Sequence, residues 1–327
     1  MYSTAEVEAM SANYEISVLM SIYNEPLSYI KQSVNSVLHQ TFPIKELIIV
    51  VDNLSLENNI IDYLRGLPAC VHVIYNDENI GLAMCMNKAF QFSTGNIIAR
   101  MDSDDIAMET RFEVEVKALH EHNCDLVCSN YKLIDENSHE LNNNYLSYTN
   151  DNLTAKLPYS NTIHHPTVIM TREAFVKVGG YRNFPCSQDY DLWLRMYDLN
   201  MTFYIVPDQL LLYRIRTTST TQKNGMKQSL TIRYIRKLYR ERKKYGNDSF
   251  SSENYEEYLT ENGLYNNHVI EKYLENSKFK KYIDSMRGEN NTLRRGIYKL
   301  ILFCKSPFHR NIYINNMKEV ILEKFKK

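Results

Sequence analysis

Three carboxylates lie within four residues of the chain, at Asp102, Asp104 and Asp105. They directly follow the apolar residues 97–101, and a short apolar run of this kind predicts a buried strand. Because side chains alternate along an extended chain, we expect Asp102 and Asp104 to point the same way and Asp105 the other way. Two carboxylates on one side suit Mg²⁺ or Mn²⁺, which takes its other ligands from water and phosphates. The alternative is an acidic turn that caps the next helix.

The elements that would position these carboxylates alternate between apolar strands and helices. The first expected strands cover residues 16–22, 46–51, 71–75 and 96–101. Segments with helical spacing of apolar residues separate them, so the pattern predicts an α/β fold with a mostly parallel sheet and helices on both faces. The acidic residues then stand at the carboxyl end of a strand, where open α/β sheets bind ligands.

The alternation continues less regularly in the middle of the chain. Further strands are expected at residues 125–129, 165–170, 203–206 and 210–213, and further helices at residues 111–120, 173–178 and 189–197. Residues 138–152 are rich in Asn and Ser, which predicts a loop.

Charge divides the 327-residue chain into two parts, with a boundary near Gly225. Residues 1–225 carry 16 Lys and Arg against 27 Asp and Glu, whereas residues 226–327 carry 22 against 12. The division predicts a catalytic or metal-binding domain over residues 1–225 and a helical, basic region over residues 226–327. The alternative for the second part is an ordinary helical surface rich in Lys and Arg.

The cysteines and the apolar segments bear on the cellular compartment. The six cysteines include no C-x-x-C pair, which predicts free thiols in a reducing cytosol rather than a zinc site. Residues 1–14 lack the basic start and apolar stretch of a signal peptide, and no apolar run approaches the roughly 18 residues that span a bilayer. We therefore expect a cytoplasmic protein that is either soluble or peripheral at the inner face of the cell membrane.

Seven short segments over residues 15–220 occur in an order that is typical of one enzyme family. They are ISVLMSIYNE (16–25), IIVVDN (48–53), NIGLA (79–83), ARMDSDD (99–105), HPT (165–167), GGY (179–181) and QDYDLW (188–193). Together they resemble glycosyltransferase family 2, whose members are inverting enzymes with a GT-A fold, a Rossmann-like sheet flanked by helices. Within that family the chain is similar to bacterial O-antigen and capsule enzymes.

The resemblance implies a nucleotide site where the first strands end. Asp52 would accept the imide N–H of uracil, and Tyr23 would stack on the base. Glu25 would shape the same pocket, and Asn79 would approach the diphosphate at a helix start. Plainer interpretations remain open: Asp52 as a turn residue and Tyr23 as a packing residue. Likewise, Glu25 would be an acid in the first turn of a helix and Asn79 a helix cap.

The resemblance also implies which groups carry the chemistry. Asp102 and Asp104 form a DXD-like motif that would hold Mn²⁺ or Mg²⁺ against the diphosphate of a UDP-sugar. Asp189 matches the general base that takes a proton from the acceptor hydroxyl. Gln188 stands where relatives more often carry Glu. Asp191 is a competing candidate for the base, and we interpret it as a first-turn helix acid.

Four more side chains have two interpretations each. Arg216 stands where many relatives carry His. A guanidinium cannot ligate a metal, but it binds phosphate bidentately. Arg216 would therefore contact the diphosphate, or else it is a surface arginine. His164 and His165 are predicted to be structural or to line the acceptor pocket rather than to ligate a metal. Trp193, the single tryptophan, is either a platform for the acceptor sugar or a core residue.

These assignments predict transfer of glucose or galactose from a UDP-sugar to a lipid-diphosphate-linked sugar, with an N-acetylhexosamine as the acceptor. Basic and apolar residues interleave over residues 232–244, which predicts an amphipathic helix that binds anionic membrane headgroups. The alternative is a non-catalytic sugar- or nucleotide-binding subunit of a glycan-assembly complex, which the retained acids disfavour. No nucleic-acid-binding module is recognisable, so no nucleic-acid partner is expected.

Overall fold

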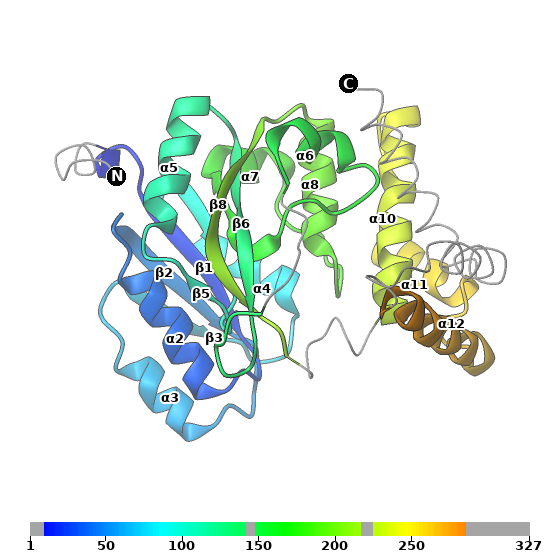
Figure 1. Cartoon of the computed structure of the whole chain (residues 1–327), viewed down its shortest axis with the longest axis horizontal. Helices are drawn as coiled ribbons and strands as arrows, with labels where there is room; N and C mark the ends of the chain where they lie inside the picture. The colour runs from blue at the N-terminus through cyan, green and yellow to red at the C-terminus, as the bar shows by residue number, and fades with distance from the viewer. Residues whose placement is uncertain (1–9, 142–147, 217–224, 286–327) are drawn as a thin grey trace. The chain divides into compact units, whose positions relative to one another are not determined.

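The computed structural model describes residues 10–141, 148–216 and 225–285 of the chain (Figure 1). These residues form two compact units. The first contains residues up to 157 together with 161–216, and the second contains residues 158–160 together with 225–285.

The first unit is built on one eight-stranded sheet in the order β3-β2-β1-β4-β7-β6-β8-β5. The strands are β1 (Ile16–Ile22), β2 (Ile44–Val51), β3 (Val71–Tyr75), β4 (Ile97–Arg100), β5 (Ile106–Ala107), β6 (Leu126–Ile134), β7 (Val168–Thr171) and β8 (Phe203–Arg214). Neighbours from β3 to β4 pair in parallel, as do β6 and β8, whereas β7 runs antiparallel to both of its neighbours and β5 to β8. The sheet is therefore mostly parallel, which confirms the predicted fold class.

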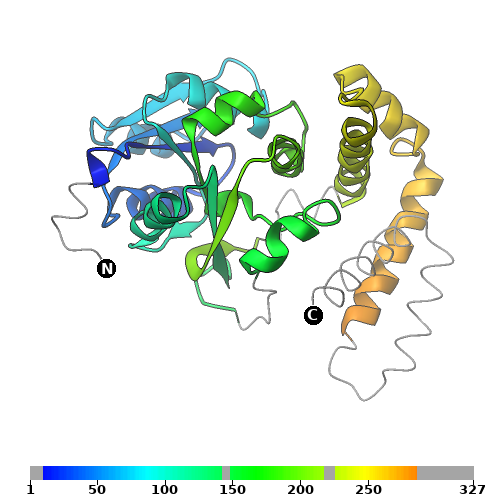
Figure 2. The ribbon, with the colours of Figure 1, turned by 90° about the horizontal axis from the view of Figure 1, so that it is seen from above.

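Helices cover both faces of this sheet (Figures 1 and 2). They are α2 (Leu27–Leu38), α3 (Asn58–Arg65), α4 (Leu82–Phe92), α5 (Arg111–His122), α6 (Asn150–Lys156), α7 (Arg172–Val178) and α8 (Gln188–Asp198), with a 3₁₀ turn η1 at His165–Thr167. Alternate residues of β1 and β2 pack with α2, α3 and α5 in one core cluster. The intervening residues, such as Leu19 and Ile48, are buried outside that cluster, and α4 contacts the same two strands. Burial on both faces explains why the strands read as continuous apolar runs.

Several elements differ from the sequence-based expectation. Strand β6 extends to Ile134 instead of ending at residue 129, and β7 begins at Val168 because residues 165–167 form η1. The segments at 203–206 and 210–213 belong to one strand, β8, because a register shift against β6 accommodates the exposed residues around Pro207. Helix α6 begins inside the predicted loop 138–152, where Thr149 and Asn152 form a reciprocal capping box. The two-residue strand β5 is too short to leave a sequence pattern.

The second unit is helical, with α10 (Gly225–Tyr245), α11 (Ser252–Glu261) and α12 (Asn267–Ser285). The apolar side of α10 is buried against other residues: the ring of Tyr234 lies 5.4 Å from that of Tyr255 and 4.9 Å from that of Tyr258. Thr231 and Tyr255 share a hydrogen bond of 2.6 Å. The predicted amphipathic helix therefore forms, but packing within the protein occupies its apolar side. None of the described helices combines the length and apolar character that crossing a bilayer needs.

Candidate active site

The candidate site lies at the edge of the sheet where parallel strands end. Tyr23, Asp52 and Asp102 follow β1, β2 and β4, which are adjacent and parallel, so their carboxyl ends meet at one edge. Strand β8 runs in the same direction as these three and brings Arg216 to that edge. This is the edge at which open α/β sheets bind ligands.

All three carboxylates of the acidic segment converge. One oxygen each of Asp102, Asp104 and Asp105 lie within 4.8 Å of one another. The expectation that Asp105 points away is wrong, because β4 ends at Arg100 and the chain turns at residues 103–105 instead of staying extended. Asp105 is fully buried; its Oδ1 accepts from the backbone N–H of Arg214 at 2.8 Å. Its Oδ2 is buried and has no hydrogen-bond partner among the described residues.

Two arginines neutralise part of this negative charge. Nη1 of the buried Arg100 lies 2.5 Å from Asp102 Oδ2. Nε of Arg216 lies 2.7 Å from Asp104 Oδ2, and its Nη2 lies 3.6 Å from Glu25 Oε1. Sequence reasoning had selected Arg216 but not Arg100, which falls inside an apolar run where a charge is not expected.

Burial and mutual repulsion act on the protonation of the acids. Burial raises the pKa of Asp104 to about 7, and the negative charges of Asp102 and Glu25 add to the rise, whereas the positive charge of Arg216 opposes it. Burial, together with the charges of Asp102 and Asp104, raises the pKa of Asp105 well above its ordinary value. The cluster is therefore short of positive charge, and a bound cation would favour the ionised forms.

Arg214 anchors the acidic turn and is a residue that sequence reasoning missed. Its Nε donates to the carbonyl of Asp104 at 2.8 Å, and one Nη donates to Gln32 Oε1 at 2.7 Å. The other Nη donates to Asp135 O, Glu136 O and Ser138 Oγ. Its guanidinium also lies 4.2 Å from the ring of Tyr29. Because four of these five acceptors belong to loop or turn residues, no spacing in the sequence marks the role of Arg214.

Asp52 is buried and holds the chain that leads into α4. Its Oδ1 accepts from the Asn76 side chain at 2.7 Å and from the N–H of Ile80 at 2.9 Å, and its Oδ2 accepts from the N–H of Gly81 at 2.9 Å. Asn79 donates to the carbonyl of Asp52 at 3.1 Å. Asn79 is not the helix cap considered above, because Gly81 occupies the N-cap of α4.

Tyr23 and Glu25 lie in the connection between β1 and α2. The Tyr23 side chain is 49% exposed, which leaves its ring open to a planar ligand. The N–H of Tyr23 donates to Glu25 Oε2 at 2.8 Å. Glu25 precedes Pro26, the N-cap of α2, and the first turn of that helix contains no acid. The alternative interpretation of Glu25 as a first-turn acid is therefore wrong.

Asp189 lies at the start of α8 and is partly exposed. Its Oδ2 accepts from the Asn161 side chain at 2.8 Å. Burial raises the pKa of Asp189, while the hydrogen bond from Asn161 and the charge of Arg100 oppose the rise. Arg100 thus lies within electrostatic range of Asp189 and in contact with Asp102. The charge of Arg100 therefore acts on Asp189, the carboxylate that matches the general base, and also on Asp102 in the acidic turn.

The other candidates on α8 are internal. Asp191 is fully buried and accepts from Arg195 Nε at 2.8 Å, with Arg182 at 3.7 Å. Its role as a helix acid with a structural partner agrees with the interpretation that we favoured. Trp193 is also fully buried, so it is a core residue and not an exposed sugar platform.

The two neighbouring histidines lie in aromatic surroundings. The ring of His164 stacks on Tyr131 at 4.2 Å and meets the edge of Tyr213 at 4.4 Å. His165 shares a hydrogen bond of 2.7 Å with the hydroxyl of Tyr181. Burial lowers the pKa of His164 to about 4 and also lowers the pKa of His165. Both rings are therefore neutral near pH 7.

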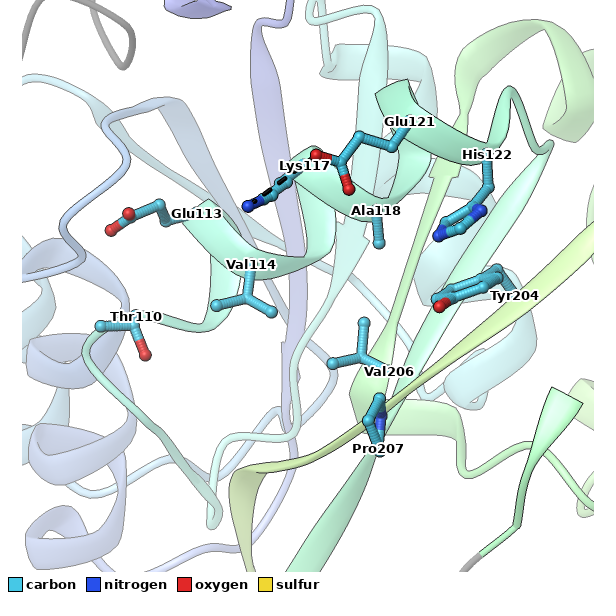
Figure 3. A pocket seen from close by; sticks show the side chains of 10 residues that line it. All are labelled: Thr110, Glu113, Val114, Lys117, Ala118, Glu121, His122, Tyr204, Val206 and Pro207. Carbon is cyan, nitrogen blue, oxygen red and sulfur yellow. Dashed lines mark ion pairs between the residues drawn. The ribbon is translucent and has the colours of Figure 1, made fainter. Parts of the chain in front are cut away.

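A hollow with a volume of about 390 Å³ lies elsewhere, between α5 and β8 (Figure 3). The stacked rings of His122 and Tyr204, 3.7 Å apart, form one of its sides. Lys117 and Glu121 pair at 3.8 Å on its rim. None of the predicted site residues lines this hollow, so it is separate from the acidic turn.

Comparison with known proteins identifies the family of this chain. The family model described as glycosyl transferase family 2 matches residues 17–179. An uncharacterized glycosyltransferase of Methanocaldococcus jannaschii is 30% identical over 234 residues, which cover 70% of this chain and 81% of the relative. The chain belongs to glycosyl transferase family 2.

Other relatives agree with this assignment. The O-antigen biosynthesis glycosyltransferase WbnJ of Escherichia coli is 33% identical over 219 residues, 64% of this chain and 83% of WbnJ. The structure of S. aureus TarS 1–349 in complex with UDP-GlcNAc is 19% identical and superimposes with a TM-score of 0.57, covering 76% of this chain and 71% of TarS 1–349. At that identity the likeness shows the fold, which is GT-A.

Proposed function

We propose that this family-2 member is an inverting glycosyltransferase that moves a hexose from a UDP-sugar to a lipid-diphosphate-linked sugar. The observation that carries the proposal is the convergence of three carboxylates where β4 ends, with a separate carboxylate, Asp189, within electrostatic range of Arg100, which contacts Asp102. A glycosyltransferase needs both features, since one neutralises the leaving diphosphate and the other activates the acceptor.

The acidic turn fits a divalent cation, Mn²⁺ or Mg²⁺. Carboxylate oxygens are the ligands that these cations prefer, and the unpartnered Oδ2 of Asp105 is the kind of buried atom that such a charge satisfies. Asp102 and Asp104 would hold the ion, and Asp105 would add a third carboxylate close to both. When bound, the ion would act as a Lewis acid that neutralises charge on the departing UDP.

The nucleoside would lie along the ends of β1 and β2. The exposed ring of Tyr23 would stack on uracil, with Glu25 and Asn79 at the margin of the pocket. Each oxygen of a carboxylate can accept two hydrogen bonds, and Asp52 Oδ2, which accepts from the N–H of Gly81, would also accept the imide N–H. Arg216 would contact the diphosphate.

Asp189 would act as the general base. It would accept the proton of the acceptor hydroxyl while that oxygen attacks the anomeric carbon from the face opposite UDP. The α-linked donor would then give a β-linked product. The raised pKa of Asp189 makes the carboxylate a stronger base than an exposed Asp, which suits this role. Because residue 188 is Gln and not Glu, it adds no second negative charge next to Asp189.

The relatives support a place in polysaccharide synthesis. WbnJ is named for O-antigen biosynthesis, and a relative from Erwinia amylovora is named for amylovoran biosynthesis. By that analogy we propose glucose or galactose as the donor sugar and an N-acetylhexosamine on a lipid diphosphate as the acceptor. The reaction would then take place at the cytoplasmic face of the membrane, and the basic residues of α10 would bind its anionic headgroups.

A donor screen tests the proposal. Purified protein, Mn²⁺ and a GlcNAc- or GalNAc-diphosphate-lipid would be incubated with each UDP-sugar, and UDP release and product linkage would be measured, the latter by NMR. We expect one UDP-hexose to give a β-linked product. Asp189→Asn should lower the rate by about 10²–10⁴-fold while UDP affinity is kept. An α-linked product would contradict the inverting mechanism, and UDP binding without turnover would indicate a non-catalytic subunit.

A further inference from the structure

Asp102 and Asp104, the two acids proposed to ligate the cation, lie beside Arg100 and Arg216 respectively. The two arginine side chains differ in burial and in their place in the fold. Arg100 belongs to β4, and its side chain is 3% exposed. Arg216 lies beyond the last residue of β8, and its side chain is 16% exposed. Of this pair, Arg216 is the one that can leave its carboxylate without disrupting a strand of the sheet.

The contact between Arg216 and Asp104 is held by charge rather than by an aligned hydrogen bond. Nε of Arg216 lies 2.7 Å from Asp104 Oδ2, yet its N–H makes no hydrogen bond within the described part of the chain. Its Nη2 lies 3.6 Å from Glu25 Oε1, which is longer than a hydrogen bond. Arg216 is therefore paired with Asp104 by charge, without an aligned hydrogen bond from Nε that fixes its orientation, and Glu25 lies beyond hydrogen-bond range.

We propose that Arg216 and the divalent cation compete for Asp104, so that cation binding releases Arg216 toward the diphosphate. The inference rests on the proposed function and adds a coupling between its two ligands. A guanidinium and a dication beside the same carboxylate repel each other, so each weakens the contact of the other with Asp104. Glu25 would keep the released side chain near the site.

The released guanidinium suits a diphosphate. Its planar fork donates two parallel hydrogen bonds to phosphate oxygens, and release from Asp104 would let the fork turn toward them. The cation and the nucleotide would therefore strengthen each other's binding by more than their direct contact provides. Because such coupling is reciprocal, it is measurable from either ligand.

This competition predicts that one substitution, Arg216→Gln, changes the affinities for Mn²⁺ and for UDP in opposite directions. Removing the charge in Arg216→Gln removes the competitor, so nucleotide-free protein should bind Mn²⁺ about three- to tenfold more tightly. The same change removes a phosphate contact, so UDP in the presence of Mn²⁺ should bind about tenfold more weakly. A residue that only supported the fold would weaken both ligands together.

The experiment measures free Mn²⁺ by electron paramagnetic resonance in titrations without nucleotide, and UDP binding by calorimetry with and without Mn²⁺. Arg216→Ala repeats the test without a Gln amide that could itself ligate the ion. Arg216→Lys keeps the charge but not the fork, so Mn²⁺ affinity should stay within about twofold while UDP binding weakens. Arg65→Gln, an equal charge change at an exposed site on α3, should alter neither.

The outcomes separate the inference from the proposed function. Unchanged or weaker Mn²⁺ binding by Arg216→Gln and Arg216→Ala, in a protein that binds UDP with Mn²⁺, would overturn the competition alone. Wild-type protein that binds neither Mn²⁺ nor UDP would overturn both proposals. Thermal unfolding of every variant, measured alongside, establishes that differences in affinity come from folded protein.

Discussion

The hydrogen bond between Asn161 and Asp189 makes the proposed base testable through its titration. Asn161 donates to Asp189 Oδ2 at 2.8 Å and so favours the charged carboxylate. Asn161→Ala removes this donor, and the pKa of Asp189, already raised by burial, should rise further. Because a base works in its deprotonated form, activity should fall at a higher pH as the solution is acidified. The profile of kcat/KM against pH measures the shift.

A control variant distinguishes this effect from the general loss of a side-chain amide. Asn130 donates its side chain to the carbonyl of Pro207 at 3.0 Å, without a carboxylate partner. Asn130→Ala should change the rate or the stability without moving the acid limb of the profile. An acid limb that stays in place in Asn161→Ala would mean that another group limits the reaction at low pH.

Residue types predicted which acids and which arginine of the candidate site come together, but not the contacts that they make. The motif residues Asp102, Asp104 and Arg216 do meet at one edge of the sheet. The position of Asp105 was predicted wrongly because an extended chain was assumed through a turn. The contact between Arg100 and Asp102 could not be predicted, because it depends on the path of the chain after β4 and not on the spacing of residues in the sequence.

At the scale of elements, the start of α4 depends on a backbone shape that only glycine adopts readily. Gly81 has φ 79° and ψ 160°, whereas Gly179, at the C-terminal end of α7, has φ 79° and ψ 25°. The second shape is left-handed helical, which Asn tolerates, and the first is essentially restricted to glycine. Gly81→Asn should therefore cost about 1–3 kcal/mol in the free energy of unfolding, and Gly179→Asn less than about 1 kcal/mol.

Chemical denaturation of the two Asn variants measures this difference. Both positions are open, with no atom within 4 Å of an added Cβ, so steric overlap at that atom does not separate the variants. Equal losses at Gly81 and Gly179 would show that the backbone shape at the start of α4 is not the cause. The larger loss at Gly81 should also weaken UDP binding, because the N–H of Gly81 holds Asp52.

Elements with a strong periodic pattern were predictable, and those fixed by tertiary contacts were not. Strands β1 to β4 follow apolar runs that burial on both faces imposes, and each was expected to within two residues at either end. Strand β5 exists because two residues pair with β8, which no local pattern encodes. Helix α6 is fixed by a capping box within a polar segment that resembles a loop.

At the scale of the whole molecule, the two units carry opposite charge, and the basic one includes α10. The apolar residues of that helix, such as Leu230 and Leu238, are buried in the protein, so they are not available to contact lipid. Lys237, Lys243 and Lys244 remain exposed on the same helix. Membrane binding through α10 would therefore depend on charge alone.

Charge-only binding has a definite signature in vesicle assays. Each Lys near an anionic surface contributes about 1 kcal/mol, so the triple variant Lys237→Gln, Lys243→Gln, Lys244→Gln should bind anionic vesicles about a hundredfold more weakly. Binding of the wild-type protein should also fall steeply with salt, since surface charges are screened.

The control for this prediction changes three exposed or half-exposed lysines on the first unit, Lys45, Lys132 and Lys177, to Gln. Net charge changes equally in the two triple variants, so a loss confined to the α10 set assigns binding to that helix. Equal losses would mean that total charge, not α10, governs attraction to the vesicle. Binding that persists at about 1 M salt, where the Debye length is about 3 Å, would instead require an apolar contact that the buried side of α10 does not offer.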